Sequence, residues 1–249
     1  MRRYLRWIFL VVVIALVLAG VGFAVWAYST PAPLPAAEAA MQSGADVEVS
    51  TENWLVFQPE TVEPTTGYIF YPGGRVRPES YAPYARELAD AGYLVVVVPM
   101  PMNLAVLGID RAGEVIAAYP GIEQWVMGGH SLGGSMAARY AFDHPEQIAG
   151  LVLLASYPEA DRDFSGREIV AASIYGSLDG LATVYQVEAA RTLFPADASF
   201  IEIEGGNHAQ FGWYGEQAGD NPATISREDQ QQQTLAATLA VLEQVAAGE

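Results

Sequence analysis

Two kinds of hydrophobic segment alternate along most of this chain. Short, uninterrupted apolar runs, such as LVVVV at 94–98 and GLVLLA at 150–155, are typical of strands that are buried on both faces of a sheet. Between these runs lie longer stretches in which apolar residues recur at helical spacing. A repeated succession of strand and helix indicates a mostly parallel sheet with helices on both faces. The sequence therefore predicts an α/β fold, a class that many activities share.

The pattern assigns an element to most of the chain after residue 45. Strands are predicted at 46–57, 67–71, 93–99, 124–128, 150–155, 169–175 and 199–203. Helices are predicted at 81–91, 110–119, 132–143, 184–194 and 227–247. The last helix has Ser226 as its N-cap and Asp229 three residues later, which resembles a capping box.

The N-terminal segment differs from all of these, because residues 7–28 contain no charged side chain. At the α-helical rise of about 1.5 Å per residue it spans roughly 33 Å, enough to cross the hydrocarbon core of a bilayer. Arginines precede it at positions 2, 3 and 6, and Trp7, Trp26 and Tyr28 lie near its ends. This arrangement predicts a single-pass membrane helix with a cytoplasmic N-terminus and the remaining chain outside the cytoplasm.

A cleaved signal peptide is the alternative, because Val25-Trp26-Ala27 resembles a small-residue cleavage site and would give a secreted protein. The apolar run is longer than the usual h-region of about 7–15 residues, which favours a retained anchor. The expected organisation is a cytoplasmic stub at 1–6, the anchor at 7–28, a Pro/Ala-rich spacer at 29–45 and the main domain at 46–249. We expect the spacer to be extended and to lift the domain off the membrane.

Charge narrows the choice of partners. All 29 acidic residues and nine of the twelve arginines follow residue 28, and the chain has no lysine, so the exported part carries 9 − 29 = −20. Such a field repels phosphate backbones and argues against nucleic-acid binding. Solubility is the simplest role of this charge. The chain also has no cysteine, which excludes disulfides and thiol nucleophiles.

Candidate chemistry begins at Gly129-His130-Ser131-Leu132-Gly133, where an apolar strand runs into an alanine-rich helix. In a G-x-S-x-G turn between strand and helix, the serine is held in a strained conformation and the glycines leave room for neighbouring backbone. The free N–H groups at the start of the helix favour the anion that forms when the hydroxyl attacks a carbonyl. The alternative is a glycine-rich turn that only packs a helix on a strand.

A serine nucleophile needs a base, and the chain has three histidines. His208 lies in a loop directly after the last predicted strand and is our candidate base. We expect His130 to support the turn beside Ser131. His144 falls at a helix end, where it is expected to cap carbonyl groups. An ordinary exposed loop histidine is the alternative for His208.

The acid that orients this base is expected between Ser131 and His208 in the chain. Asp179 follows the strand predicted at 169–175 and is flanked by glycine, which makes it the preferred candidate. Asp161 and Asp163 follow the preceding strand and are rivals. In this role a carboxylate fixes the tautomer of the histidine and stabilises its imidazolium form.

Two backbone donors are needed for an acyl oxyanion. One is expected to be the N–H of Leu132, the residue after the serine. The other is expected in the sequence YPGGR at 71–75, which follows an early strand. We assign Gly74, with Arg75 as the alternative, while Pro-Gly-Gly is also a common structural turn.

Four segments together resemble small, lidless α/β-hydrolases of the fold-5 type. They are YPGGRV at 71–76, GGHSLGG at 128–134, YGSLDGL at 175–181 and GGNHAQFGWYG at 205–215. The resemblance runs from about Val47 to the C-terminus. It implies Ser131, Asp179 and His208 as a catalytic triad. It also implies the Gly74 and Leu132 amides as the oxyanion hole.

The sequence offers no room for a cap domain at the usual place, because only residues 156–168 separate two successive predicted strands. We therefore expect an open, shallow site shaped by loops. Phe211, Trp213 and Tyr214 follow His208 and either line an apolar rim or pack as anchors of the loop.

These observations predict an exported, monomeric serine hydrolase that acts on an ester, thioester or amide through an acyl-enzyme. The chemistry requires no metal or cofactor. An acyltransferase passes through the same acyl-enzyme and stays an alternative, as does a hydrolase-fold module that binds without catalysis. Placement beside a membrane favours a small-molecule, lipid or cell-envelope ester as substrate.

Overall fold

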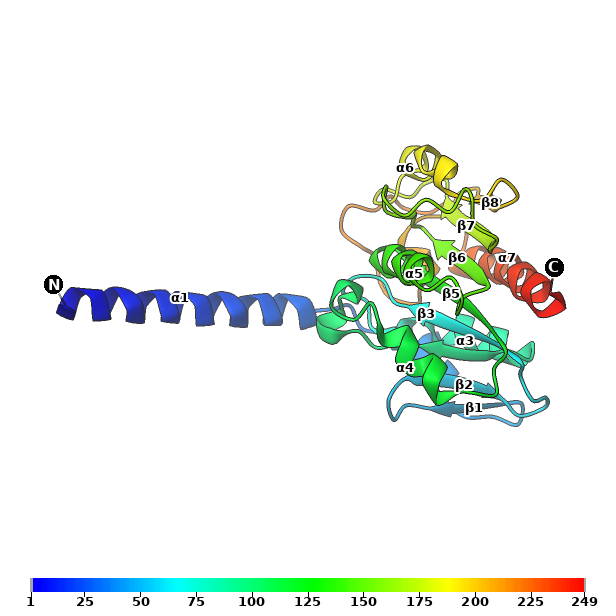
Figure 1. Ribbon diagram of the computed structural model, residues 1–249, viewed down its shortest axis with the longest axis horizontal. Helices are drawn as coiled ribbons and strands as arrows, with labels where there is room; N and C mark the ends of the chain where they lie inside the picture. Colours follow the sequence, from blue (N-terminus) through cyan, green and yellow to red (C-terminus); the bar gives the residue numbers. More distant parts are fainter. Residues whose placement is uncertain (1, 249) are drawn as a thin grey trace.

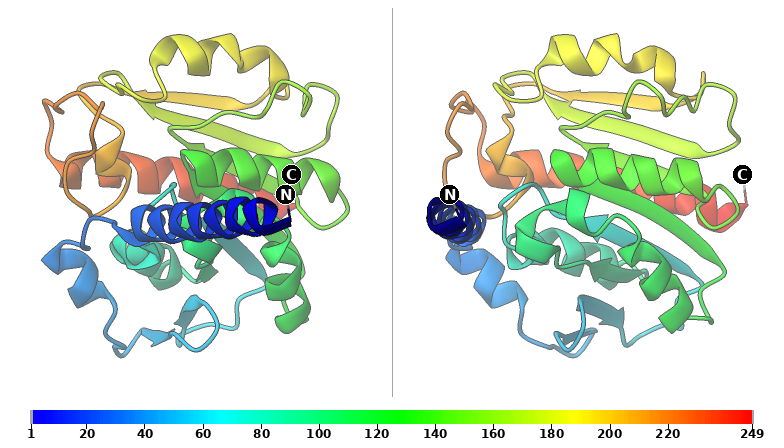
Figure 2. Two further views of the ribbon diagram at one scale, coloured as in Figure 1. Left: turned by 90° about the vertical axis from the view of Figure 1, so that its left-hand side faces the viewer. Right: turned by 60° about the vertical axis from the view of Figure 1, so that its left-hand side comes forward.

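Eight strands form one sheet, in the order β1-β2-β4-β3-β5-β6-β7-β8, in the computed structural model, which describes residues 2–248. The strands are β1 Val47–Ser50, β2 Leu55–Pro59, β3 Thr66–Tyr71, β4 Leu94–Val97, β5 Gln124–His130, β6 Gly150–Leu154, β7 Val170–Gly176 and β8 Ser199–Ile203. The pairs β1–β2 and β2–β4 are antiparallel, and all other neighbours are parallel. The expected mostly parallel sheet is confirmed. Figure 2 shows the β1–β2 hairpin at one edge and β8 at the other.

One predicted strand was wrong. The segment 46–57 is the start of a hairpin, in which Val47 pairs with Pro59 and Ser50 with Val56. Polar residues at 51–53 make the turn, while apolar residues on both sides continue the same pattern. The hydrophobic pattern alone therefore did not separate the two strands.

Helices cover both faces of the sheet, as Figure 1 shows. The helices of the described residues are α1 Arg2–Tyr28, α2 Pro35–Ala40, α3 Ala82–Asp90, α4 Arg111–Ala118, α5 Leu132–Asp143, α6 Val184–Ala189 and α7 Arg227–Ala247, of which α1 lies away from the sheet. Single 3₁₀ turns lie at η1 Pro78–Tyr81, η2 Pro101–Asn103, η3 Ala105–Leu107, η4 Arg191–Leu193 and η5 Ala209–Phe211. The predicted N-cap is confirmed, because the Ser226 side chain accepts a hydrogen bond from the Asp229 N–H.

The core consists of two layers, one on each face of the sheet. Strand β4 shows why its apolar run is uninterrupted. Val95 and Val97 point into the layer under α3 and α7, whereas Leu94 and Val96 point into the layer under α4 and α5. A strand with helices on both sides has no polar face.

Residues 155–169 connect β6 to β7 and contain neither helix nor strand. A cap domain is therefore absent from this connection, as expected.

The N-terminal helix α1 projects away from the domain (Figure 1) and is long and apolar enough to cross a membrane. The residues that follow it differ from the extended spacer expected from the sequence. Pro33 forms an isolated antiparallel bridge with Tyr214, and α2 packs on α3 with Ala37 fully buried. The segment is therefore bound to the domain, because its proline and alanine side chains are small and apolar enough to pack there.

Candidate active site

Ser131 lies at the turn between β5 and α5, in a conformation that side chains rarely adopt. Its φ is 52° and its ψ is −125°. Strained backbone of this kind persists where the surroundings enforce it. Here β6 and the residues after it do so. The Ser131 N–H donates to the Leu154 carbonyl at 2.9 Å, and the Ser131 carbonyl accepts from Ser156 Oγ at 2.8 Å.

The glycines on either side of this turn are required by close backbone contacts. A methyl group at Gly129 would lie 2.6 Å from the carbonyl carbon of Gly133. A methyl group at Gly133 would lie 2.1 Å from the carbonyl oxygen of Tyr71, at the end of β3. The first turn of α5 therefore packs directly on the backbone that leads into the loop 72–76.

Asp179 and His208 form a buried pair. His208 Nδ1 lies 2.8 Å from Asp179 Oδ2, and the two residues are 0 % and 4 % exposed. The other carboxylate oxygen, Oδ1, accepts the N–H groups of Leu181 at 2.8 Å and Ala182 at 2.7 Å. The carboxylate is therefore fully engaged, and it fixes the ring orientation of His208.

The serine turn and the histidine loop lie side by side. The ring of His130, the residue before Ser131, is centred 4.5 Å from the ring of His208. Within residues 2–248, His208 Nε2 has no hydrogen-bond partner, and Ser131 Oγ is not bonded to it. In active sites of this type that contact often tightens only when a substrate is bound.

The structure does not bring the two rival carboxylates to His208. Asp161 is exposed and pairs with Arg162, and Asp163 is a surface residue that accepts the Ser165 N–H. Among the candidates considered from the sequence, Asp179 is the one that contacts His208.

The loop after β3 lies against the start of α5. A methyl group at Gly74 would be 3.2 Å from Leu132 Cδ2. The Arg75 N–H donates to the Asn103 carbonyl at 2.8 Å and is thus already used. Within residues 2–248, the N–H groups of Gly74 and Leu132 donate to no protein group. Of the two alternatives in this loop, the geometry favours Gly74 as an oxyanion donor.

Asp220 contributes to the site in a way that the sequence did not indicate. Its Oδ1 accepts the N–H groups of Gly180 at 3.1 Å and His208 at 3.3 Å, and its Oδ2 accepts the N–H of Ala209 at 2.9 Å. One carboxylate therefore joins the Asp179 loop to the His208 loop. Asp220 lies in a polar loop without a motif, so no pattern distinguished it from other acidic residues.

Helix α7 holds the same loop from the other side. The fully buried side chain of Gln230 accepts the Asn207 N–H at 3.0 Å and donates to the Asn207 carbonyl at 2.8 Å. Gln231 donates to the Gln210 carbonyl at 2.6 Å. His208 is thus positioned by hydrogen bonds that involve residues on both sides of it in the chain.

His130 supports the turn, as expected. It is fully buried, and its Nδ1 lies 2.9 Å from the Tyr81 hydroxyl. That hydroxyl accepts the Gly73 N–H, so its proton is available to a neutral His130. Burial, together with the neighbouring His208, lowers the pKa of His130 well below its ordinary value. His130 is therefore neutral in the folded protein at neutral pH.

The remaining candidates have structural roles. Phe211 and Tyr214 are each 1 % exposed and pack near the His130 ring, so they anchor the loop and do not form an apolar rim. His144 Nδ1 lies 3.0 Å from the Tyr140 carbonyl at the end of α5, as predicted for a helix-capping residue.

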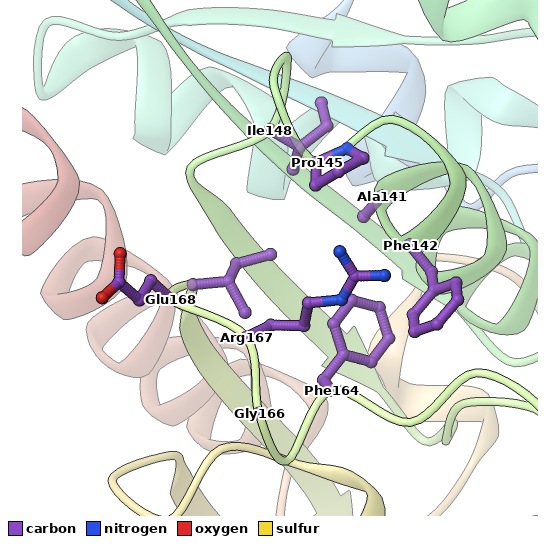
Figure 3. Close-up of a pocket in the computed structure, with 9 residues that line it drawn as sticks. Ala141, Phe142, Pro145, Ile148, Phe164, Gly166, Arg167 and Glu168 are labelled. Atoms are coloured by element: carbon purple, nitrogen blue, oxygen red, sulfur yellow. The ribbon is translucent and has the colours of Figure 1, made fainter.

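A separate pocket lies at the opposite end of α5 (Figure 3). It is lined by Ala141, Phe142, Pro145, Ile148, Phe164, Gly166, Arg167, Glu168 and Ile169. The guanidinium of Arg167 lies 4.5 Å from the centre of the Phe142 ring. This pocket contains none of the candidate residues. Among residues 2–248, no cluster of three acidic or histidine side chains is placed to hold a metal ion.

Comparison with known sequences identifies related proteins. The sequence model of the alpha/beta hydrolase family matches residues 67–232. A pimeloyl-[acyl-carrier protein] methyl ester esterase from Photorhabdus laumondii is 44% identical over 68 residues. That match covers 26% of this chain and 24% of the relative, so it concerns only part of either protein.

Solved structures show the same fold. The butyrate-bound esterase Est2 from Thermogutta terrifontis superposes with a TM-score of 0.58 at 14% identity, covering 81% of this chain and 95% of that one. The same esterase phosphoramylated by tabun superposes with a TM-score of 0.58 at 15% identity. The match covers 82% of this chain and 96% of the esterase. TT1662 from Thermus thermophilus superposes with a TM-score of 0.56 at 14% identity. The match covers 79% of this chain and 98% of TT1662.

The close contact at Gly133 predicts a large loss of stability in Gly133→Ala. The added methyl group meets backbone that cannot move without displacing β3, so the free energy of unfolding should fall by about 3 kcal/mol or more. Gly166→Ala is the control, because nothing lies within 4 Å of its new methyl group. Denaturant unfolding of both variants measures the difference, and equal stabilities would contradict this account of the turn.

The role of Asp220 predicts a local loosening in Asp220→Asn. The asparagine side chain has one acceptor oxygen where the aspartate has two. Charge-assisted hydrogen bonds to the histidine loop are therefore lost. Hydrogen–deuterium exchange of residues 205–212 should accelerate by about 10- to 100-fold. Asp197→Asn, at an exposed site, should leave this exchange unchanged. Equal exchange in the two variants would show that Asp220 does not hold the loop.

The buried, neutral His130 predicts a specific pH dependence. Its pKa is lower in the folded state than its ordinary value of 6.5, so the unfolded chain binds the proton first as the pH falls. The stability that the buried, neutral His130 contributes to the folded protein is fully present above pH 6.5. It is lost as the pH falls below 6.5, by at most about 1.4 kcal/mol per pH unit. His130→Asn keeps an acceptor for Tyr81 but does not titrate. Its unfolding free energy should therefore fall less between pH 7.5 and 5.5 than that of the wild type; equal falls would refute the assignment.

Proposed function

Because this chain belongs to the alpha/beta hydrolase family, we propose that it is a serine hydrolase that cleaves a carboxylic ester. Ser131 is the nucleophile, His208 the general base and Asp179 the residue that orients the base. The observation that carries the proposal is the buried 2.8 Å contact between Asp179 and His208, beside a serine in a left-handed turn. Nucleophilic catalysis by serine requires a base that is held in place by an acid, and the Asp179–His208 pair supports these two roles.

In the first half of the reaction, Ser131 Oγ attacks the carbonyl carbon of the ester. His208 Nε2 accepts the hydroxyl proton, and Asp179 stabilises the imidazolium that forms. The negative charge on the carbonyl oxygen is stabilised by the N–H groups of Gly74 and Leu132. The ester C–O bond then breaks, and the alcohol leaves with the proton from His208.

In the second half, water attacks the acyl group on Ser131. His208 removes a proton from the water, and the same two N–H groups stabilise the second oxyanion. Collapse of this intermediate breaks the bond to Ser131 Oγ, which recovers its proton from His208. The carboxylic acid is released, and the protein returns to its starting state.

The related proteins support an ester as substrate. One curated relative is named as a methyl ester esterase, and a solved structure with this fold is an esterase bound to butyrate. The same esterase is phosphoramylated by tabun. For this chain they support the class of bond cleaved and do not identify the acyl group or the alcohol.

We also propose that α1 remains attached as a membrane anchor. The uncharged run 7–28 is longer than the apolar core of about 7–15 residues of a usual signal peptide, which supports retention. The three arginines before the apolar run favour a cytoplasmic N-terminus, which places the domain on the other side of the membrane.

Covalent labelling tests the proposed nucleophile. A fluorescent fluorophosphonate should label the wild-type protein and should not label Ser131→Ala. Hydrolysis of p-nitrophenyl butyrate by this variant should fall by about 10³-fold or more, because serine attack is lost. Ser199→Ala, at an exposed serine, is the matched control and should behave as the wild type.

Two results would contradict the proposal. One is equal labelling of the wild type and a folded Ser131→Ala variant, which would place the reactive group elsewhere. The other is a folded wild-type protein that neither reacts with the phosphonate nor hydrolyses the ester.

A further inference from the structure

The end of α1 is bound to the loop that carries the candidate oxyanion donor. Arg75 Nε donates to the Trp26 carbonyl at 3.0 Å, and Arg75 Nη2 donates to the Ser29 carbonyl at 2.7 Å. Asn103 Nδ2 donates to the Ala27 carbonyl at 3.4 Å. Carbonyl groups in the last turn of a helix have no partner within the helix and carry partial negative charge. Arg75 therefore caps α1, and the helix end has a defined place on the domain.

The guanidinium of Arg75 also stacks on the ring of Trp26, at 4.4 Å from its centre. The backbone of Arg75 has a φ of 59°, and its N–H donates to the carbonyl of Asn103. Arg75 directly follows Gly74, whose neighbour in space is Leu132. A short series of contacts thus leads from the helix end to the serine turn.

A second attachment joins the same stretch of chain to the histidine loop. The Leu34 N–H donates to the Trp213 carbonyl at 2.8 Å, next to the bridge between Pro33 and Tyr214. The residues after α1 are therefore bound at both loops that flank Ser131. This places the candidate active site on the side of the domain from which α1 projects (Figure 1).

An apolar segment lies at the same place. Residues 100–108, which we call the entrance segment, contain η2 and η3 and contact the end of α1. Figure 1 shows them beside the last turn of that helix. Val106 and Leu107 on this segment are 48% and 51% exposed, and Leu104 Cδ2 lies 4.0 Å from the position of a methyl group on Gly74. The entrance segment thus extends from the candidate oxyanion loop to an exposed aliphatic tip.

We propose that the entrance to Ser131 opens at the membrane surface and that the substrate is an amphiphilic ester held in the bilayer. The proposal rests on the function proposed above and on α1 being a retained anchor. Trp26 and Tyr28 at the end of a membrane helix lie at the level of the headgroups. Arg75, stacked on Trp26, then lies at that level, with Gly74 one residue, or about 3.8 Å between Cα atoms, further on.

The charges near the end of α1 are of both signs, unlike the strongly negative net charge of the domain. The part of the chain after residue 28 carries a net −20, which an anionic membrane surface would repel. Arg75 lies in the loop next to α1, and Arg77 is paired with Glu79 at 3.2 Å. Val106 and Leu107 line one shallow pocket with Asp110, Arg111 and Glu114. Aliphatic side chains beside arginine are suited to the interface between headgroups and acyl chains. The bilayer is therefore the partner to which we assign the entrance segment.

Site-directed spin labelling tests this placement without reference to catalysis. The chain has no cysteine, so Leu107→Cys creates a single labelling site in the full-length protein. Val62→Cys is the control, because Val62 is 52% exposed but lies in the loop that leads into the other end of β3. In phosphatidylcholine vesicles, a nitroxide at 107 should be relaxed by membrane-dissolved oxygen, and one at 62 by an aqueous nickel chelate. Relaxation of the label at 107 mainly by the nickel chelate would overturn the proposal.

Kinetics in the same vesicles tests the substrate class. Two p-nitrophenyl esters are compared, the water-soluble butyrate and the bilayer-partitioned palmitate. The double variant Val106→Ser/Leu107→Ser should hydrolyse palmitate about tenfold more slowly, because two aliphatic side chains no longer enter the interface. Its hydrolysis of butyrate should be unchanged, and Val62→Ser should change neither rate.

If the double variant hydrolyses both esters more slowly by the same factor, or hydrolyses both at the wild-type rate, the proposed entrance is contradicted. The proposed hydrolase activity is not contradicted by either result. If the wild type hydrolyses neither ester and the phosphonate does not label Ser131, the proposed function itself fails. The spin-label result still decides the placement of the entrance segment in that case.

Discussion

The close approach of α5 to the end of β3 is the constraint on which the candidate site depends. Gly133 has no side chain, so the first turn of the helix reaches the carbonyl of Tyr71. This contact forces the chain through a left-handed residue at Ser131, because no wider turn brings the helix so close. It also brings Gly74 against Leu132, so that one packing contact sets both the exposure of the serine and the position of the two candidate amide donors.

A second constraint is the burial of a carboxylate–histidine pair. Taking Asp179 and His208 out of water is costly unless every polar atom of the carboxylate is satisfied. Backbone N–H groups satisfy one oxygen of Asp179, and His208 satisfies the other. Asp220 and Gln230 then hold the histidine loop by its backbone. The positions of Asp179 and His208 thus depend on residues that take no part in the proposed reaction.

The sequence predicted those features that depend on short-range patterns. The bounds of α5, α7 and β8 agree with prediction, since each has clear periodicity and a marked beginning. Residues 131, 179 and 208 were selected as candidates because chemistry, chain order and the family resemblance restrict the choice. Asp220 was not identified, because its role depends on two loops that meet only in the folded chain. The docking of residues 29–45 was missed for the same reason, since its partners lie far away in sequence.

The central claim is that Ser131 attacks a carbonyl whose oxygen is held by Gly74 and Leu132. A crystal structure of the protein after reaction with an alkyl phosphonate tests it most directly, because the bound phosphoryl group has the tetrahedral shape of the intermediate. The account predicts a covalent bond from Ser131 Oγ to phosphorus, with a phosphoryl oxygen about 2.7–3.1 Å from both amide nitrogens. Phosphorus bonded to another residue, or a phosphoryl oxygen directed away from both amides, would contradict it.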